Sequence, residues 1–108
     1  MLTENQIKTY QEDGFIIVPQ VISSENLQVM RDELDKWIEE SKSHNKNYGE
    51  TPNGKAQFDL EQGHSAENPK LRRVANPTDI SQVYRNVLFK GPAIEAVGDL
   101  IGPNVKFH

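Results

Sequence analysis

The sequence predicts an α+β fold, and we expect residues 1–108 to form a single small domain. Two observations predict this class. Several segments repeat apolar residues at the three- and four-residue spacing of an amphipathic helix, and capping or breaking residues bound them. Between these segments lie short runs that are rich in β-branched residues, which are typical of strands. Helices and short strands should therefore alternate along the chain.

The first helix and the first strand follow from the opening residues. Thr3 and Gln6 have the spacing of a capping box, and Gly14 suits the position after a helix end, so a helix is expected over residues 4–13. The continuous apolar run Phe15–Val18 then predicts a strand that is buried on both faces. Pro19 limits that strand at its far end.

The longest helix begins after Ser23 or Ser24, either of which can cap it. We expect its apolar stripe to pack on its own domain, because one-sided amphipathicity is what a surface helix shows, although a partner-binding helix has the same pattern. The stripe consists of Leu27, Met30, Leu34, Trp37 and Ile38.

Residues 43–68 form a polar stretch that glycine and proline interrupt repeatedly. Within it, only Gln57–Leu60 resembles a strand, and a loop of this length is usually functional or mobile. Pro69 and Pro77 then enclose the segment Lys70–Asn76, which should be extended.

Two short helices are expected near the end of the chain. Asp79 can cap the first, with Gln82 completing a capping box, and Gly91 should end it. Pro92 suits the first turn of the second helix, and Gly102 should end that helix.

The segment Val105–His108 alternates apolar and polar residues and predicts a half-buried strand. The unpaired edge of that strand would allow homo-oligomers to form, because free strand edges template association.

Composition and charge limit the class of function. The formal net charge is −4, whereas a general nucleic-acid surface carries a basic patch, so we expect no nucleic-acid partner. The chain contains no cysteine, which excludes disulfides and zinc sites built on cysteine. No apolar run approaches a membrane span and no signal peptide is visible, so a cytoplasmic protein without a membrane partner is expected.

The histidines and the basic cluster are the candidate site residues. His44 and His64 are interpreted as solvated loop residues and His108 as part of a terminal strand, so we assign no metal ligand and no catalytic residue. The basic cluster Lys70, Arg72 and Arg73 is consistent either with an exposed strand or with an anion site, since a guanidinium suits carboxylates and phosphates. Strict alternation would place Leu71 and Arg73 on one face of that strand.

Three stretches of the chain share their order and spacing with a known family. They are LTENQIKTYQEDGFIIVPQVISSENLQVMRDELDKWIEE at residues 2–40, LRRVANP at residues 71–77 and VLFKGPAIEAVGDLIGPNVKFH at residues 87–108. Together they resemble the N-terminal third of phytanoyl-CoA dioxygenase-like proteins, which are Fe(II)- and 2-oxoglutarate-dependent oxygenases. The resemblance covers nearly the whole chain and is weakest between Ser43 and Asn68.

The resemblance implies the N-terminal helices and first strands of a double-stranded β-helix, a jelly-roll or cupin-like oxygenase whose barrel is incomplete in this chain. It implies that Arg73 contacts 2-oxoglutarate. In the family, a His-x-Asp pair and a later histidine hold the iron, all downstream of the strand that would begin at Val105. This chain has no His-x-Asp, so we expect it to be inactive alone and to bind neither Fe(II) nor 2-oxoglutarate alone.

The intact parent would hydroxylate a small molecule or an acyl thioester with Fe(II), O2 and 2-oxoglutarate, according to the same resemblance. The alternative comes from a different class of protein. It is a self-standing, non-catalytic α+β interaction module that shares ancestry with these oxygenases and is stabilised by association.

Overall fold

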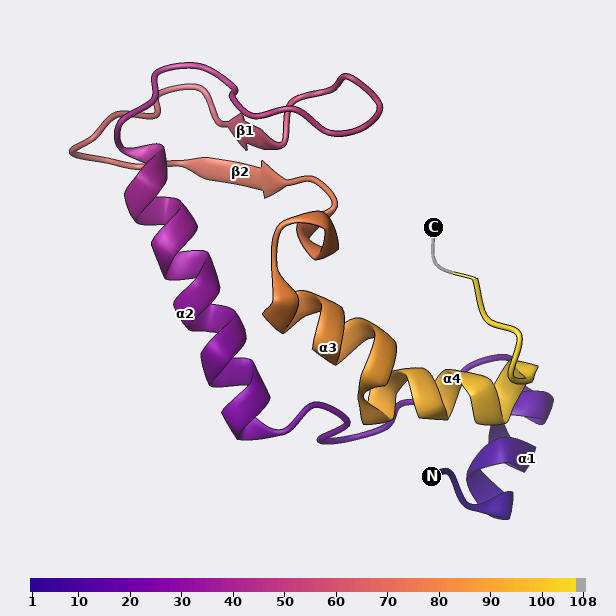
Figure 1. Cartoon of the computed structure of the whole chain (residues 1–108). Helices are drawn as coiled ribbons and strands as arrows, with labels where there is room; N and C mark the ends of the chain where they lie inside the picture. The colour runs from indigo at the N-terminus through magenta and orange to yellow at the C-terminus, as the bar shows by residue number, and fades with distance from the viewer. Residues whose placement is uncertain (107–108) are drawn as a thin grey trace.

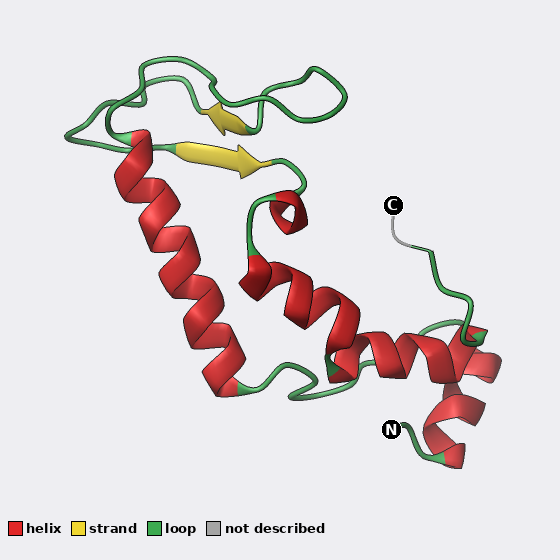
Figure 2. Ribbon diagram, in the orientation of Figure 1, coloured by secondary structure: helices red, strands yellow, loops and turns green. Residues whose placement is uncertain are grey.

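A computed structural model describes residues 1–106, and it has the α+β composition that the sequence predicts (Figures 1 and 2). Within this range β1 and β2 pair in a two-stranded antiparallel sheet. The elements are, in chain order, α1 (Glu4–Asp13), α2 (Ser24–Ser41), β1 (Phe58–Leu60), β2 (Leu71–Val74), the 3-10 turn η1 (Pro77–Asp79), α3 (Gln82–Lys90) and α4 (Pro92–Ile101).

The molecule is elongated. Its radius of gyration is 17.4 Å and its extents are 50 × 30 × 25 Å, whereas a compact domain of this length has a radius of gyration of about 13 Å. Helix α2 descends from the sheet, α3 packs beside it, and α4 then crosses α1 at the opposite end (Figure 1). The helices therefore form an open frame, and few side chains are fully buried.

The helix boundaries of the N-terminal half follow the predicted caps. The Thr3 side chain accepts a hydrogen bond from the Gln6 N–H, and the Gln6 side chain accepts one from the Thr3 N–H, which confirms the capping box. Gly14 adopts a φ of 84° and its N–H donates to the Tyr10 carbonyl at 2.8 Å. Of the two candidate serines, Ser23 caps α2.

The predicted cap of α3 is wrong. Asp79 is the last residue of the 3-10 turn η1, where its N–H donates to the Asn76 carbonyl at 2.9 Å, and it lies two residues before the residue that caps α3. The fully buried Ser81 caps the helix instead, since its hydroxyl accepts from the Tyr84 N–H at 3.3 Å. The predicted junction at Gly91 and Pro92 is confirmed.

The predicted strand at Phe15–Val18 does not form, because a strand needs a neighbour and no described backbone group pairs with this segment. The residues form part of the connection between α1 and α2. Phe15 is 62% exposed and Ile17 is 78% exposed, so burial on both faces is also wrong.

The apolar stripe of α2 is buried at only one described position. Trp37 is 7% exposed, whereas Leu34 is 39% exposed and Leu27 is similarly open. The reason is geometric. Trp37 contacts both the sheet and α3, while the more N-terminal part of the stripe lies where the frame is open (Figure 1).

The predicted strand at Val105–His108 is not confirmed. Val105 and Lys106 belong to no strand in the structure. The remainder of the prediction, Phe107 and His108, lies outside the described residues, so the oligomerisation expected from this edge stays a prediction.

Aromatic rings form the core and connect elements that are distant in sequence. The Trp37 ring stacks on Tyr84 of α3 at a centroid distance of 5.4 Å and meets Phe58 of β1 edge-on at 6.2 Å. Tyr48 stacks on Phe58 at 4.7 Å, and His44 stacks on Tyr48 at 3.5 Å. These rings join α2, the loop, the sheet and α3, and such pairs stabilise beyond their buried area.

The core tyrosines should make the fold sensitive to alkali. Burial, with a smaller contribution from the Glu33 carboxylate, raises the pKa of Tyr84 above its ordinary value of 10.0. Burial and then Glu40 raise the pKa of Tyr48. The folded state therefore holds these phenolic protons more tightly than the unfolded state, so this stabilisation is complete below about pH 10 and is lost as the pH rises through the folded pKa values.

The measurement is urea unfolding from about pH 8 to about pH 11, with phenolate absorbance recorded in parallel. Tyr84→Phe should reduce the alkaline loss of stability, because one of the two groups no longer titrates. A free energy of unfolding that stays constant across this range contradicts the prediction.

Candidate functional site

A bulge in the two-stranded sheet determines where Arg73 lies. The register opposes Asp59 to Arg73 and Leu60 to Leu71, so Arg72 has no opposite residue. Side chains that are directly opposed lie on the same face of a sheet. Leu60 and Leu71 therefore share one face and Asp59 and Arg73 the other. The predicted sharing of a face by Leu71 and Arg73 is wrong, because a bulge interrupts the alternation on which it rests.

Arg73 has a charge partner within the chain. Its Nε donates to Oδ2 of Asp59 at 2.7 Å, and its Nη2 forms an ion pair with the same oxygen. The Asp59 side chain is only 12% exposed, whereas the Arg73 side chain is 66% exposed. The arginine thus neutralises a nearly buried carboxylate while its guanidinium remains open to solvent. The sequence carried no signal for this pair, since the residues are far apart along the chain.

A cavity of about 420 Å³ adjoins Arg73. Lys55 contributes a second cation to its lining, and Thr51, Asn53 and Asn76 contribute polar side chains. Two cations beside hydroxyl and amide groups can bind an anion such as a carboxylate, which takes charge-assisted hydrogen bonds. This cavity is therefore the candidate anion site.

Gln57 holds part of the lining of this cavity in place through hydrogen bonds to Ala75, and the sequence analysis did not identify it. Its buried side-chain amide donates to the Ala75 carbonyl, and its backbone carbonyl accepts from the Ala75 N–H at 2.8 Å. These bonds hold the chain immediately after β2, where Asn76 adopts a left-handed φ of 46°. The only available signal was its place at the start of the predicted strand Gln57–Leu60.

His64 is a structural residue rather than a solvated one, so that interpretation is wrong. Its Nδ1 accepts a hydrogen bond from the Lys70 N–H at 2.8 Å. The Nε2 therefore carries the ring proton and donates to the carbonyls of Ser41 at 2.9 Å and His44 at 3.1 Å. Ser41 is the last residue of α2 and His44 lies three residues beyond it, so His64 caps the C-terminal end of that helix and ties it to the segment before β2.

Replacing His64 should destabilise the fold measurably. His64→Ala removes three hydrogen bonds and leaves the carbonyls of the buried Ser41 and the half-buried His44 without this donor, which should lower the free energy of unfolding by about 1–3 kcal/mol. The measurement is urea unfolding at neutral pH. Gln62→Ala, at an exposed neighbouring position, is the control and should change stability by less than about 0.5 kcal/mol. Equal effects of the two substitutions contradict the capping role.

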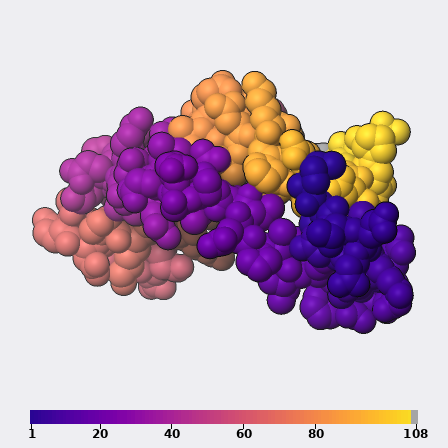
Figure 3. All heavy atoms as spheres, turned by 90° about the horizontal axis from the view of Figure 1, so that it is seen from below, coloured from indigo at the N-terminus to yellow at the C-terminus, as the bar shows by residue number. Residues whose placement is uncertain are grey.

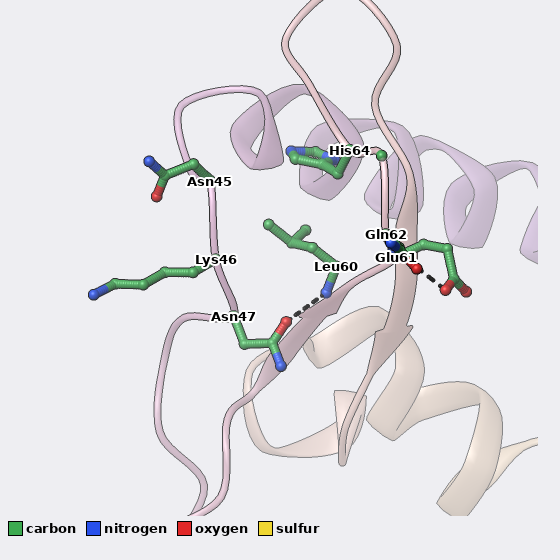
Figure 4. A pocket seen from close by; sticks show the side chains of 8 residues that line it. Asn45, Lys46, Asn47, Leu60, Glu61, Gln62 and His64 are labelled. Atoms are coloured by element: carbon green, nitrogen blue, oxygen red, sulfur yellow. Dashed lines mark hydrogen bonds between the residues drawn. The ribbon is translucent and has the colours of Figure 1, made fainter.

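The hollow beside His64 does not bring polar side chains together around one point. It has a volume of about 610 Å³, and Leu60 lies near its centre (Figure 4). Asn45 and Lys46 point away from His64, and Asn47 uses its side-chain oxygen to accept from the Leu60 N–H at 2.8 Å (Figure 4). We therefore place the candidate site at Arg73 and not here.

No group of three or more His, Asp or Glu side chains within residues 1–106 is placed to hold a metal ion. None of the helices in this range combines the length and the apolar character needed to cross a membrane.

Comparison of the chain with protein-family models, with curated proteins and with solved structures gave no match.

Proposed function

We propose that this chain is the N-terminal portion of a phytanoyl-CoA dioxygenase-like, Fe(II)- and 2-oxoglutarate-dependent hydroxylase. The observation that carries the proposal is the exposed guanidinium of Arg73. It lies on a sheet of only two described strands, and few apolar side chains are buried around that sheet. Arg73 lies on this sheet beside the anion cavity, and Trp37 and Phe58 are the buried apolar side chains among residues 1–106. Such a unit would scaffold one side of a jelly roll, whose remaining strands would complete the core.

The residues present do not fit an iron centre. The chain has no His-x-Asp, and residues 1–106 bring no suitable trio of side chains together. In the proposal, the two histidines and the aspartate that hold the iron, called the facial triad, lie on the remaining strands of the jelly roll. The oxidative chemistry therefore belongs to those strands. The parent would hydroxylate an unactivated C–H bond, consuming O2 and 2-oxoglutarate and releasing succinate and CO2.

The residues present do fit one carboxylate of 2-oxoglutarate. Arg73 keeps most of its guanidinium exposed although it pairs with Asp59, and Lys55 lines the same cavity. A guanidinium presents five N–H donors in a planar fork, so it can hold one carboxylate in the protein and a second in a ligand. We assign Arg73 the role of a cosubstrate-binding residue on these grounds and on the family resemblance.

The alternative function is a non-catalytic interaction module. The exposure of Phe15 and Ile17 favours it, because apolar side chains that are open to solvent mark interaction surfaces. The two functions predict different coding regions after residue 108. The hydroxylase requires a coding region that continues past residue 108 into a His-x-Asp and a later histidine, whereas a stop codon at that point supports the module.

Turnover provides the biochemical test. We expect residues 1–108 alone to form no succinate from 2-oxoglutarate with added Fe(II) and ascorbate, because no facial triad is present. The protein with the iron-binding strands should form succinate under the same conditions. Metal-dependent turnover by the 108-residue chain above a no-protein control contradicts the proposed division of roles, and an inactive longer protein contradicts the hydroxylase.

A further inference from the structure

A three-residue hairpin loop borders the candidate anion cavity. The Gly54 N–H donates to the Thr51 carbonyl at 2.9 Å, and the Thr51 N–H donates to the Lys55 carbonyl at 2.8 Å, which closes the loop. Gly54 adopts a φ of 78°, the left-handed conformation that a loop of this kind requires after its turn. Asn53 is exposed at the tip of this loop and lines the cavity together with Lys55.

Asn53 and Gly54 can react with each other, and water is the only reagent that the reaction consumes. The Gly54 nitrogen bonds to the side-chain amide carbon of Asn53. The carbon–nitrogen bond of that amide breaks, and the amide nitrogen leaves as ammonia with the proton of the Gly54 N–H. The product is a cyclic succinimide, which water opens at either carbonyl to give aspartate or isoaspartate. No oxidation state changes, and a neutral amide becomes a carboxylate.

The structure leaves room for this reaction at Gly54. Glycine has no side chain to hinder the attack of its nitrogen. A Cβ placed on Gly54 would meet no atom within 4 Å beyond its chain neighbours, so the loop tip can accommodate the ring and the longer isoaspartyl backbone. The attack requires the Gly54 N–H to leave the Thr51 carbonyl, and exposed loops open locally at little cost in free energy.

The sequence restricts the reaction to this asparagine. No other asparagine in the chain precedes a glycine. Asn68 and Asn76 precede proline, whose nitrogen carries no hydrogen and therefore cannot lose one to close the ring. Asn45 serves as an internal control, because it is exposed in the same polar stretch, residues 43–68, but precedes Lys46. Deamidation should therefore be fastest at Asn53.

We propose that Asn53 is a deamidation site and that the carboxylate produced there becomes an internal anion of the Arg73 cavity. Lys55 and Arg73 line this cavity with Asn53. The Arg73 side chain is 66% exposed although it pairs with Asp59, so its guanidinium keeps N–H donors for a second carboxylate. The new carboxylate would take charge-assisted hydrogen bonds from the same cations that a ligand carboxylate needs. Deamidation therefore closes the cavity to anions.

Peptide mapping by mass spectrometry tests the modification. The wild-type chain is incubated in mildly alkaline solution, and the gain of about 1 Da that marks deamidation is followed at each asparagine. Conversion at Asn53 should be at least about 10-fold faster than at Asn45, because the Lys46 side chain hinders the attack that Gly54 permits. Equal rates at the two asparagines, or no conversion at Asn53, overturn the proposal.

Nuclear magnetic resonance of the arginine side chains tests the position of the new charge. Asn53→Asp, which is the aspartate product, should shift the Nε–H signal of Arg73, whereas Asn45→Asp should not. Arg31 is the reference signal, since it belongs to the N-terminal half of α2, which lies away from the sheet (Figure 1). An Arg73 signal that is the same in both variants overturns the proposal.

The helical frame should be unaffected by the modification. In the space-filling view β2 lies at one end of the molecule and α1 at the other (Figure 3). The circular dichroism of Asn53→Asp should therefore match that of the wild type. A loss of helical signal would show that the new charge disrupts the fold, and it overturns an effect confined to the cavity.

The consequence for cosubstrate binding rests on the proposed function. In an oxygenase that contains this chain, Asn53→Asp should raise the 2-oxoglutarate concentration required for turnover by about 10-fold, because its carboxylate competes for Arg73 and Lys55. Asn45→Asp adds the same charge outside the cavity and should leave the requirement unchanged. An unchanged requirement in Asn53→Asp overturns the closure of the cavity. A longer protein without oxygenase activity overturns the proposed function alone, since the mapping and the Arg73 signal are measured without 2-oxoglutarate.

Discussion

Trp37→Ala should lower the free energy of unfolding by about 3–5 kcal/mol, which is the usual cost of truncating a buried aromatic side chain. Trp37 stacks on Tyr84 and meets Phe58 edge-on, so its ring joins α2 to both α3 and β1. The core of this open frame contains few other buried apolar side chains among residues 1–106. The loss is therefore a large share of the roughly 5–15 kcal/mol by which native domains are stable.

The control for this substitution lies one turn away on the same helix. Leu34 belongs to the same apolar stripe but is 39% exposed, so Leu34→Ala should cost well below the 2–5 kcal/mol that a buried leucine would. Urea unfolding followed by circular dichroism measures both variants. If Leu34→Ala destabilises the chain as much as Trp37→Ala, then the whole stripe is covered in solution. That result would indicate a partner on α2.

Arg73→Ala should raise the 2-oxoglutarate concentration required for turnover by roughly 10- to 150-fold in an oxygenase that contains this chain. Hydrogen bonds to a charged group contribute about 1.5–3 kcal/mol, which corresponds to that range. Arg72→Ala should change the requirement little. Arg72 is the unopposed residue of the bulge, and its ion pair with Glu61, at 3.9 Å, joins two exposed side chains.

Asp59→Ala separates a ligand-binding role of Arg73 from a structural one. This variant removes the internal partner of Arg73 and keeps the cation. It should leave the 2-oxoglutarate requirement unchanged or lower it, because the guanidinium is then free for the ligand. The assay is a 2-oxoglutarate titration of all three variants beside the wild type, with folding checked by circular dichroism.

The assignment of Arg73 is contradicted by any of three results: Arg72→Ala is the variant that loses affinity, no arginine variant does, or Asp59→Ala loses as much as Arg73→Ala. The last result would show that Arg73 only supports the sheet.

The sequence by itself determined the helices and most of their ends. The cap at Thr3, the left-handed glycine at Gly14 and the junction of Gly91 with Pro92 all lie where the residues predict them. These features depend on groups within a few residues of each other, such as a side-chain oxygen and an N–H three residues later. Local chemistry of this kind is readable without knowledge of the fold. Where two local signals competed, as at Asp79 and Ser81, the one chosen from the sequence was wrong.

Only the tertiary structure decided which segments meet. The bulge at Arg72, the ion pair of Arg73 with Asp59 and the helix cap formed by His64 all join residues that are more than a few positions apart. The Phe15–Val18 segment shows the same limit, since its residues favour a strand and yet no described segment pairs with it through backbone hydrogen bonds. A strand is stabilised by its neighbours, and the neighbour is not encoded in the strand's own residues.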